Sequence, residues 1–171
     1  MFYHPNHPLH NKEELEIRYM TAKEEDILTD RALLKNGTAI DRALQNLVVD
    51  KNIKVDELLV GDKNAVVVAA RITGYGSEYE TKVTCPACGE TDDFMFDLED
   101  LEIENTAEAI ESLGISLTER KTFMLTLPLS KVEVECRLLT GADENRMFKQ
   151  AQRKQKKKMG SSMLTDQLKE V

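Results

Sequence analysis

The residues best suited to chemistry lie in one short turn, Cys85-Pro86-Ala87-Cys88-Gly89. Two thiolates three residues apart can bind one metal ion from a single turn, as in half of a zinc ribbon. Pro86 restricts its own φ angle, and Gly89 permits the positive φ that returns the chain. The spacing predicts a zinc knuckle with Cys85 and Cys88 as ligands. A structural zinc needs four ligands, and this turn offers two.

Other candidate ligands are few. Cys136 could be a third ligand, but it keeps the apolar alternation of Val132 and Val134, which favours a small core residue instead. The acids Asp92 and Asp93 lie close to the turn, yet exposed acids in turns are common. The three histidines all lie near the N-terminus and are separated from one another by Pro5 and Pro8: His4, His7 and His10. We expect them to belong to an extended arm, and the alternative is that one or two of them complete the metal site.

Two other interpretations of the cysteine pair stay open. A thioredoxin-like redox motif has the same Cys-x-x-Cys spacing, but it usually opens a helix, whereas this turn is expected between two strands. We therefore favour a zinc knuckle over a redox pair. A degenerate knuckle, which keeps the tight turn without a metal, is an equal alternative to a working zinc site.

Composition excludes several classes of protein. The chain has 171 residues, a net charge of -8, 41% apolar and 32% charged residues, which is typical of a folded soluble protein. It has no long apolar run and no signal-peptide pattern, so a disulfide framework is not expected from its three cysteines. The negative charge and the absence of Trp disfavour nucleic-acid binding. With no catalytic set of residues and no phosphate-binding loop, we expect a protein that is not an enzyme.

The pattern before the cysteine turn is mainly helical. A half-buried strand is expected over residues 15–19. A Thr21/Glu24 capping box then opens a helix that Asn36-Gly37 ends, and Thr38 caps the next helix. Residues 62–74 fit either a buried strand or a helix, and we predict a helix because of Asp62, the alanines and the closing glycine.

The second half is mainly β. Alternating residues predict a hairpin over 77–98 with the cysteines at its tip, and a second hairpin over 123–138. Short helices are expected over 106–113 and from 163 onward, and a longer one after Thr140 that runs into the basic segment 153–158. No internal repeat is visible. We predict an α+β protein with an extended arm (1–13), an N-terminal strand and helical part (14–76) packed on a mainly antiparallel β part (77–139), and C-terminal helices (140–171).

The order of several short motifs resembles a known family. These motifs are Glu16-Ile17-Arg18-Tyr19-Met20-Thr21, Asn36-Gly37-Thr38, Leu58-Leu59-Val60-Gly61-Asp62, Arg71-Ile72-Thr73-Gly74-Tyr75-Gly76, Cys85-Pro86-Ala87-Cys88-Gly89 and Leu138-Leu139-Thr140-Gly141-Ala142-Asp143-Glu144. Together they resemble the small baseplate hub proteins of contractile-tailed phages, the T-even-like baseplate hub family. The resemblance covers roughly residues 14 to 150.

This resemblance implies a structural or assembly component of a phage tail baseplate hub, which acts by protein–protein contacts with other tail proteins. It implies a virion protein assembled in the host cytoplasm. No cofactor is certain, and zinc is a candidate only because of the Cys85/Cys88 pair itself. The arm and the basic C-terminal helix are the expected docking elements, so the arm should be dispensable for folding. The alternative is a zinc-ribbon adaptor that binds a polymerase or nucleic acid.

Overall fold

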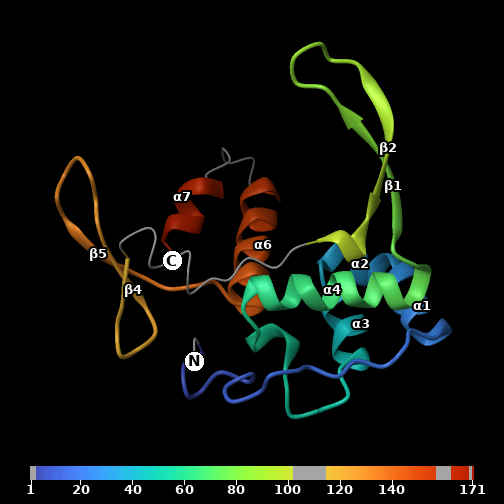
Figure 1. Ribbon diagram of the computed structural model, residues 1–171, viewed down its shortest axis with the longest axis horizontal. Helices are drawn as coiled ribbons and strands as arrows, with labels where there is room; N and C mark the ends of the chain where they lie inside the picture. Colours follow the sequence, from blue (N-terminus) through green and yellow to red (C-terminus); the bar gives the residue numbers. More distant parts are fainter. Residues whose placement is uncertain (1–2, 102–114, 157–162, 170) are drawn as a thin grey trace.

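A computed structural model describes residues 3–101, 115–156, 163–169 and 171 (Figure 1). A helical body carries two hairpins that extend from it in different directions. The helices are α1 (Ala22–Thr29), α2 (Arg31–Asn36), α3 (Ala39–Leu47), η1 (Val55–Glu57), α4 (Val60–Tyr75), η2 (Leu98–Asp100), α6 (Gly141–Lys156) and α7 (Met163–Leu168). The strands are β1 (Glu78–Thr84), β2 (Thr91–Asp97), β3 (Ser116–Leu117), β4 (Phe123–Thr126) and β5 (Glu133–Cys136).

The hydrophobic core lies in the N-terminal half, between α3, η1 and α4. Its fully buried members include Leu47, Val48, Val55 and Leu58. The apolar periodicity that predicts α3 places its buried face here, and α4 adds Val66. The predicted helix over 62–74 is confirmed, and it begins two residues earlier, at Val60.

The predicted helix after Thr21 is present but broken in two. The capping box of Thr21 and Glu24 opens α1 as expected. The chain then leaves the helix at Asp30, whose side chain accepts hydrogen bonds from the backbone N–H groups of Ala32 and Leu33 at 2.7 and 3.0 Å. Asp30 thus caps a second helix, because short acidic side chains bind free N–H groups best at a helix start. Gly37, with a φ of 69°, ends α2.

Residues 3–13 differ from the expected extended arm. They form consecutive turns, in which the backbone N–H of His7 donates to the carbonyl of His4 and that of His10 to the carbonyl of His7. Leu9 is 8% exposed and belongs to the core, and the Tyr3 hydroxyl donates to the Asp62 carboxylate at 2.8 Å. Proline prevents a regular helix here, but it is compatible with turns that deliver one apolar side chain to the core.

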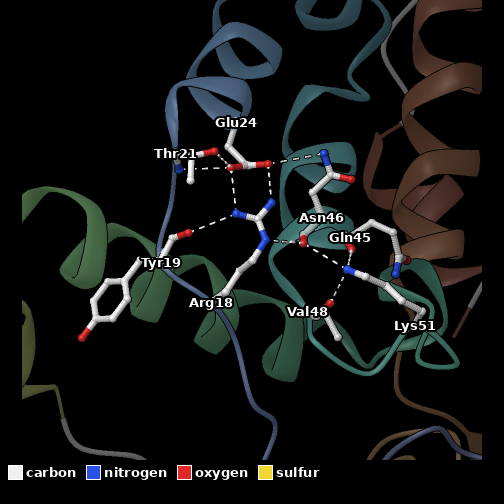
Figure 2. Close-up of polar contacts among 8 residues, drawn as sticks. All are labelled: Arg18, Tyr19, Thr21, Glu24, Gln45, Asn46, Val48 and Lys51. Carbon is white, nitrogen blue, oxygen red and sulfur yellow. Dashed lines mark hydrogen bonds and ion pairs between the residues drawn. The ribbon is translucent and has the colours of Figure 1, made fainter.

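The segment before α1 is held by an ion pair with a buried carboxylate rather than by a full strand. Its only strand-like pairing among the described residues is one bridge between Ile17 and Val48. Arg18 donates two hydrogen bonds to the Glu24 carboxylate, at 2.6 and 3.1 Å, and one to the Asn46 carbonyl (Figure 2). Glu24 has no exposed surface, and it also accepts from the Thr21 hydroxyl and backbone N–H. The pair therefore joins the N-terminal segment, α1 and α3.

The same arrangement recurs at the start of α6. Arg137 donates two hydrogen bonds to the Asp143 carboxylate, at 2.6 and 3.0 Å, and the Thr140 hydroxyl and backbone N–H both donate to that carboxylate at 2.9 Å. Both carboxylates are buried, and both arginines precede their acid by six residues. The structure thus contains a local repeat, so the expectation of no internal repeat is wrong for these two segments. Residues 14–25 and 133–144 have identical amino acids at five positions: Glu14 and Glu133, Glu16 and Glu135, Arg18 and Arg137, Thr21 and Thr140, and Glu25 and Glu144.

The two predicted hairpins are confirmed. β1 pairs with β2 in antiparallel register from Glu78↔Asp97 to Thr84↔Thr91, and β4 pairs with β5 from Phe123↔Cys136 to Thr126↔Glu133. A short strand that was not predicted, β3, pairs with β4. The predicted helix over 106–113 lies outside the described residues. The α+β class is confirmed, and no helix in the part of the chain that the structure describes is long and apolar enough to span a bilayer.

Candidate interaction site on the β1–β2 hairpin

The β1–β2 hairpin projects from the end of α4, away from the other helices (Figure 1). Gly76 turns the chain with a φ of 85°. Arg71 on α4 then donates to the carbonyls of Gly76 and Glu78, at 2.7 and 3.1 Å, and lies over the ring of Tyr79. The N–H of Leu98 donates to the Ser77 carbonyl at 3.0 Å and closes the base. These contacts fix the hairpin only at its root.

One face of this hairpin is apolar and uncovered. Residues directly opposite in an antiparallel pair share a face, so Tyr79 lies beside Phe96 and Thr81 beside Phe94. The rings of Phe94 and Phe96 are in contact, with centroids 4.6 Å apart. Phe94 is nevertheless 52% exposed, and Val83 on the same face is 44% exposed. Aromatic side chains of this size are normally buried against a partner.

The rest of the hairpin is strongly acidic. The segment 78–100 carries one basic side chain, Lys82, against eight acids: Glu78, Glu80, Glu90, Asp92, Asp93, Asp97, Glu99 and Asp100. Lys82 lies 3.7 Å from Asp93, which is the only salt bridge that the structure shows among these described residues. Most of the chain's net charge of -8 is therefore concentrated here, beside the apolar face.

The cysteine turn forms the tip of the hairpin, as predicted. The backbone N–H of Cys85 donates to the Glu90 carbonyl at 2.8 Å, and that of Gly89 donates to the Cys85 carbonyl at 2.9 Å. Gly89 has the expected positive φ, 74°. Hydrogen bonds from the backbone N–H of Cys88, then from that of Ala87, and from the Cys88 side chain lower the pKa of Cys85 below that of an ordinary thiol. The turn therefore brings both sulfur atoms to one side.

The structure does not bring the other predicted ligands to this tip. Cys136 is half-buried on β5, opposite Phe123, on the hairpin that extends from the other side of the body (Figure 1). The histidines stay with the N-terminal turns, where His7 stacks on Tyr3 and His10 Nδ1 lies 3.2 Å from the Tyr3 carbonyl. Among the described residues, which include every cysteine and histidine of the chain, no group of three potential metal ligands comes together.

An open hollow of about 400 Å³ lies between the N-terminal turns and the two segments that precede β4 and follow β5. His4, His7 and Arg137 are among its lining residues. Two threonine hydroxyls that line the hollow serve the local fold, because Thr140 donates to the Asp143 carboxylate and Thr122 donates to the Glu135 carboxylate. The Tyr3 hydroxyl, which also lines the hollow, donates to the Asp62 carboxylate and ties the N-terminal turns to α4.

The uncovered position of the hairpin is the feature that sequence reasoning missed. The alternation of Phe94 and Phe96 with Met95 correctly predicts a strand with one apolar face. The density of acidic side chains around the cysteines was the available signal that this strand is solvated, since so many charges cannot enter a core.

Comparison with known proteins gives the family. The model of the family described as T4 bacteriophage base plate protein matches residues 3–123, which include the N-terminal turns, α1 to α4 and the cysteine hairpin. The match thus begins earlier and ends sooner than the resemblance over residues 14 to 150. No curated protein and no solved structure matches the chain. Because the matched residues make up most of the sequence, this chain belongs to the family of T4 bacteriophage base plate proteins and is a structural component of a phage tail baseplate.

Proposed function

We propose that this protein is a subunit or assembly factor of the baseplate hub, and that it acts through protein–protein contacts. Its partners are other baseplate and tail proteins, and it is assembled in the host cytoplasm into the tail of the virion. Membership of the family supports a location in the baseplate. The β1–β2 hairpin supports an action through protein–protein contacts. The assignment to the hub rests on the resemblance of the short sequence motifs to the baseplate hub proteins.

The observation that carries this proposal is the uncovered apolar face of the hairpin. Tyr79, Val83, Phe94 and Phe96 expose between 43 and 52% of their surface on one side of a two-stranded sheet. An isolated two-stranded hairpin is only marginally stable in water, so a second surface that covers this face stabilises the hairpin as well as the complex. Aromatic residues of this kind provide most of the binding energy at protein interfaces.

The acidic side chains define the partner surface. A partner that covers the aromatic face must place Lys or Arg opposite the carboxylates at its rim, because like charges would oppose the contact. We therefore infer a tail protein with an apolar groove bordered by basic residues. The same charge disfavours the alternative, a zinc-ribbon adaptor on nucleic acid, since a phosphate backbone would be repelled by this hairpin.

The two docking elements expected from the sequence have weaker support than the hairpin. The N-terminal turns place Leu9 in the protein's own core. On α6, Lys154 forms an ion pair with Asp166 of α7, so part of the basic segment is used within the chain. The hairpin, by contrast, presents a continuous surface to solvent.

A matched pair of variants tests the proposed mode of action. Phe94→Ser removes a ring from the apolar face, whereas Met95→Ser shortens the next side chain, which is 57% exposed on the opposite face. Incorporation into tails is measured by complementation of a phage that lacks this gene. We expect Phe94→Ser to weaken the contact by about 2 kcal/mol, roughly 30-fold, and Met95→Ser to behave as wild type. Equal incorporation of both variants, with unchanged folding by circular dichroism, would contradict a role for this face.

The hub assignment needs a separate measurement. Baseplate intermediates from infected cells are fractionated, and this protein is quantified in each fraction by mass spectrometry. We expect it to accompany the hub intermediates. Its presence only in peripheral baseplate intermediates would exclude the hub while leaving baseplate membership intact. Quantification in purified virions then separates a permanent subunit from an assembly factor.

A further inference from the structure

We propose that Cys85 and Cys88 form one half of a tetrahedral zinc site, and that a second copy of this chain supplies the other half. The two hairpin tips then meet across a two-fold axis, with four thiolates around one ion. This inference concerns the isolated protein and does not rest on the hub assignment.

The local geometry of the turn fits a metal-binding pair. The backbone N–H of Cys85 donates to the Glu90 carbonyl at 2.8 Å, and that of Gly89 donates to the Cys85 carbonyl at 2.9 Å. These two bonds close the turn and hold Cys85 and Cys88 together at the tip, at the spacing from which two thiolates bind one zinc ion.

The chain itself cannot complete this site with further cysteine or histidine. Cys136 lies on β5, and its hairpin and the cysteine tip extend from different sides of the body (Figure 1). The histidines lie in the N-terminal turns, with His7 stacked on Tyr3. Among the described residues, no aspartate or glutamate joins the two cysteines to form a group of three potential ligands. Zinc in a structural site takes four ligands, so two must come from outside this chain.

A second copy provides the missing ligands in the simplest way. A two-fold axis through the metal presents the same two cysteines twice and gives the Cys₄ set of structural zinc sites. The tip stands at the end of two strands of seven residues each, so it extends about 23 Å from its root at 3.3 Å per residue. Two such tips can meet while the helical bodies remain apart.

The acidic side chains make this contact depend on the metal. Glu90, Asp92 and Asp93 of two copies would be brought together at the tip, and without a cation they repel one another. The same carboxylates raise the local concentration of a divalent cation. The metal-free protein is therefore expected to be monomeric, and zinc is expected to couple binding to dimerisation.

The test uses the full-length protein, purified with its thiols reduced. Zinc is titrated while molecular mass is followed by light scattering, and Co²⁺ is used in a parallel titration because its absorption reports thiolate ligation. We expect saturation at half an ion per chain, conversion of monomer to dimer, a cobalt spectrum of four thiolates, and reversal by a chelator. One ion per monomer, or no binding, would overturn the proposal.

Serine variants identify the ligands. Cys88→Ser is expected to abolish both zinc binding and the zinc-dependent dimer, whereas Cys136→Ser is expected to retain both. Neither strand of the hairpin contributes a buried residue, so Cys88→Ser is expected to keep the circular dichroism spectrum and melting temperature of the wild type. Zinc-dependent dimerisation that survives Cys88→Ser would contradict this site. A Cys85–Cys88 disulfide that persists in millimolar glutathione and prevents zinc binding would show a redox pair instead. Because the purified chain alone is measured, either result is independent of incorporation into tails.

Discussion

Glu24 and Asp143 occupy equivalent positions in two copies of one local structure. Each buried carboxylate accepts hydrogen bonds from an arginine six residues earlier and from a threonine three residues earlier. In each copy the arginine also donates to the carbonyl of the residue that follows it. Each copy enters its helix beside a single antiparallel bridge, Ile17↔Val48 in the first and Leu59↔Thr140 in the second. We call these two clusters of an arginine, a threonine and a buried acid the clamps. The bridges beside them pair the segment before α1 with Val48 and the segment before α6 with Leu59, so both segments lie against the same core.

Replacement of the first buried carboxylate should destabilise the protein. Glu24→Gln keeps the size of the side chain but removes the charge that Arg18 and Thr21 bind. We expect the free energy of unfolding to fall by about 2 kcal/mol, the range for hydrogen bonds to charged groups, because Arg18 remains partly in water. Urea unfolding measures the loss. Glu16→Gln, at an exposed position nearby, is the control and should change stability by less than about 0.5 kcal/mol.

The same clamps predict loss of stability in acid. The hydrogen bonds from Arg18 lower the pKa of Glu24 from 4.5 to about 2, and those from Arg137 hold the pKa of Asp143 well below its usual value. Carboxylates with a depressed folded-state pKa stabilise the protein fully above their unfolded pKa, and this contribution is lost as the pH falls toward the folded value. Stability should therefore decrease as the pH is lowered from about 4.5 to about 2.

Comparison of the wild type with Glu24→Gln measures how much Glu24 contributes to the loss of stability in acid. Urea midpoints are measured between pH 6 and pH 2 for the wild type and for Glu24→Gln. The difference in unfolding free energy between them should shrink as the pH falls, because the wild-type carboxylate becomes protonated as well. A constant difference over the whole range would show that the charge of Glu24 does not contribute.

The N-terminal turns should be required for full stability, contrary to the expectation of a dispensable arm. Leu9 is 8% exposed within the core cluster. Leu9→Ala should lower the free energy of unfolding by about 2–3 kcal/mol, the lower part of the range for truncation of a buried leucine. Pro5→Ala changes an exposed residue of the same segment and should have a much smaller effect. If deletion of residues 1–12 left the melting temperature unchanged, this contact would not matter for folding.

Two helical glycines should respond in opposite directions to alanine. A Cβ at Gly141 would lie 3.1 Å from the Asp56 Cα and 3.2 Å from the Val55 carbonyl oxygen, both rigid backbone atoms. A Cβ at Gly61, inside α4, would meet no atom within 4 Å. We expect Gly141→Ala to lower the melting temperature, and Gly61→Ala to raise the free energy of unfolding by about 0.5 kcal/mol through helix propensity. A stabilised Gly141→Ala variant would mean that η1 and α6 can separate.

Local rules predict the local elements of this fold well. The capping box of Thr21 and Glu24, the periodicity of α3 and the alternation around Phe94 and Phe96 each depend on near neighbours in the chain, and each gives the right element. The break at Asp30 was missed because the apolar stripe continues across it, so the competing cap is visible only in the hydrogen bonds of its side chain.

What could not be predicted depends on contacts between distant segments. No local rule connects Arg18 to the Asn46 carbonyl, or Leu9 to the core, so the N-terminal segment was expected to be extended. Alternation shows that a strand has an apolar face, but not what covers that face. The zinc hypothesis for Cys85 and Cys88 stays a prediction. The structure adds the closed backbone turn that holds the two cysteines and the distant location of Cys136.

Because the β1–β2 hairpin projects from the body, its side chains and those of the core serve different purposes. Both of its strands are fully described, and neither contains a buried residue, so the body does not need any particular side chain there to fold. Under the proposed function, a substitution in the hairpin would change binding to the partner without disturbing the core. An exchange of residues 77–98 between relatives should accordingly transfer the choice of partner from one baseplate to another.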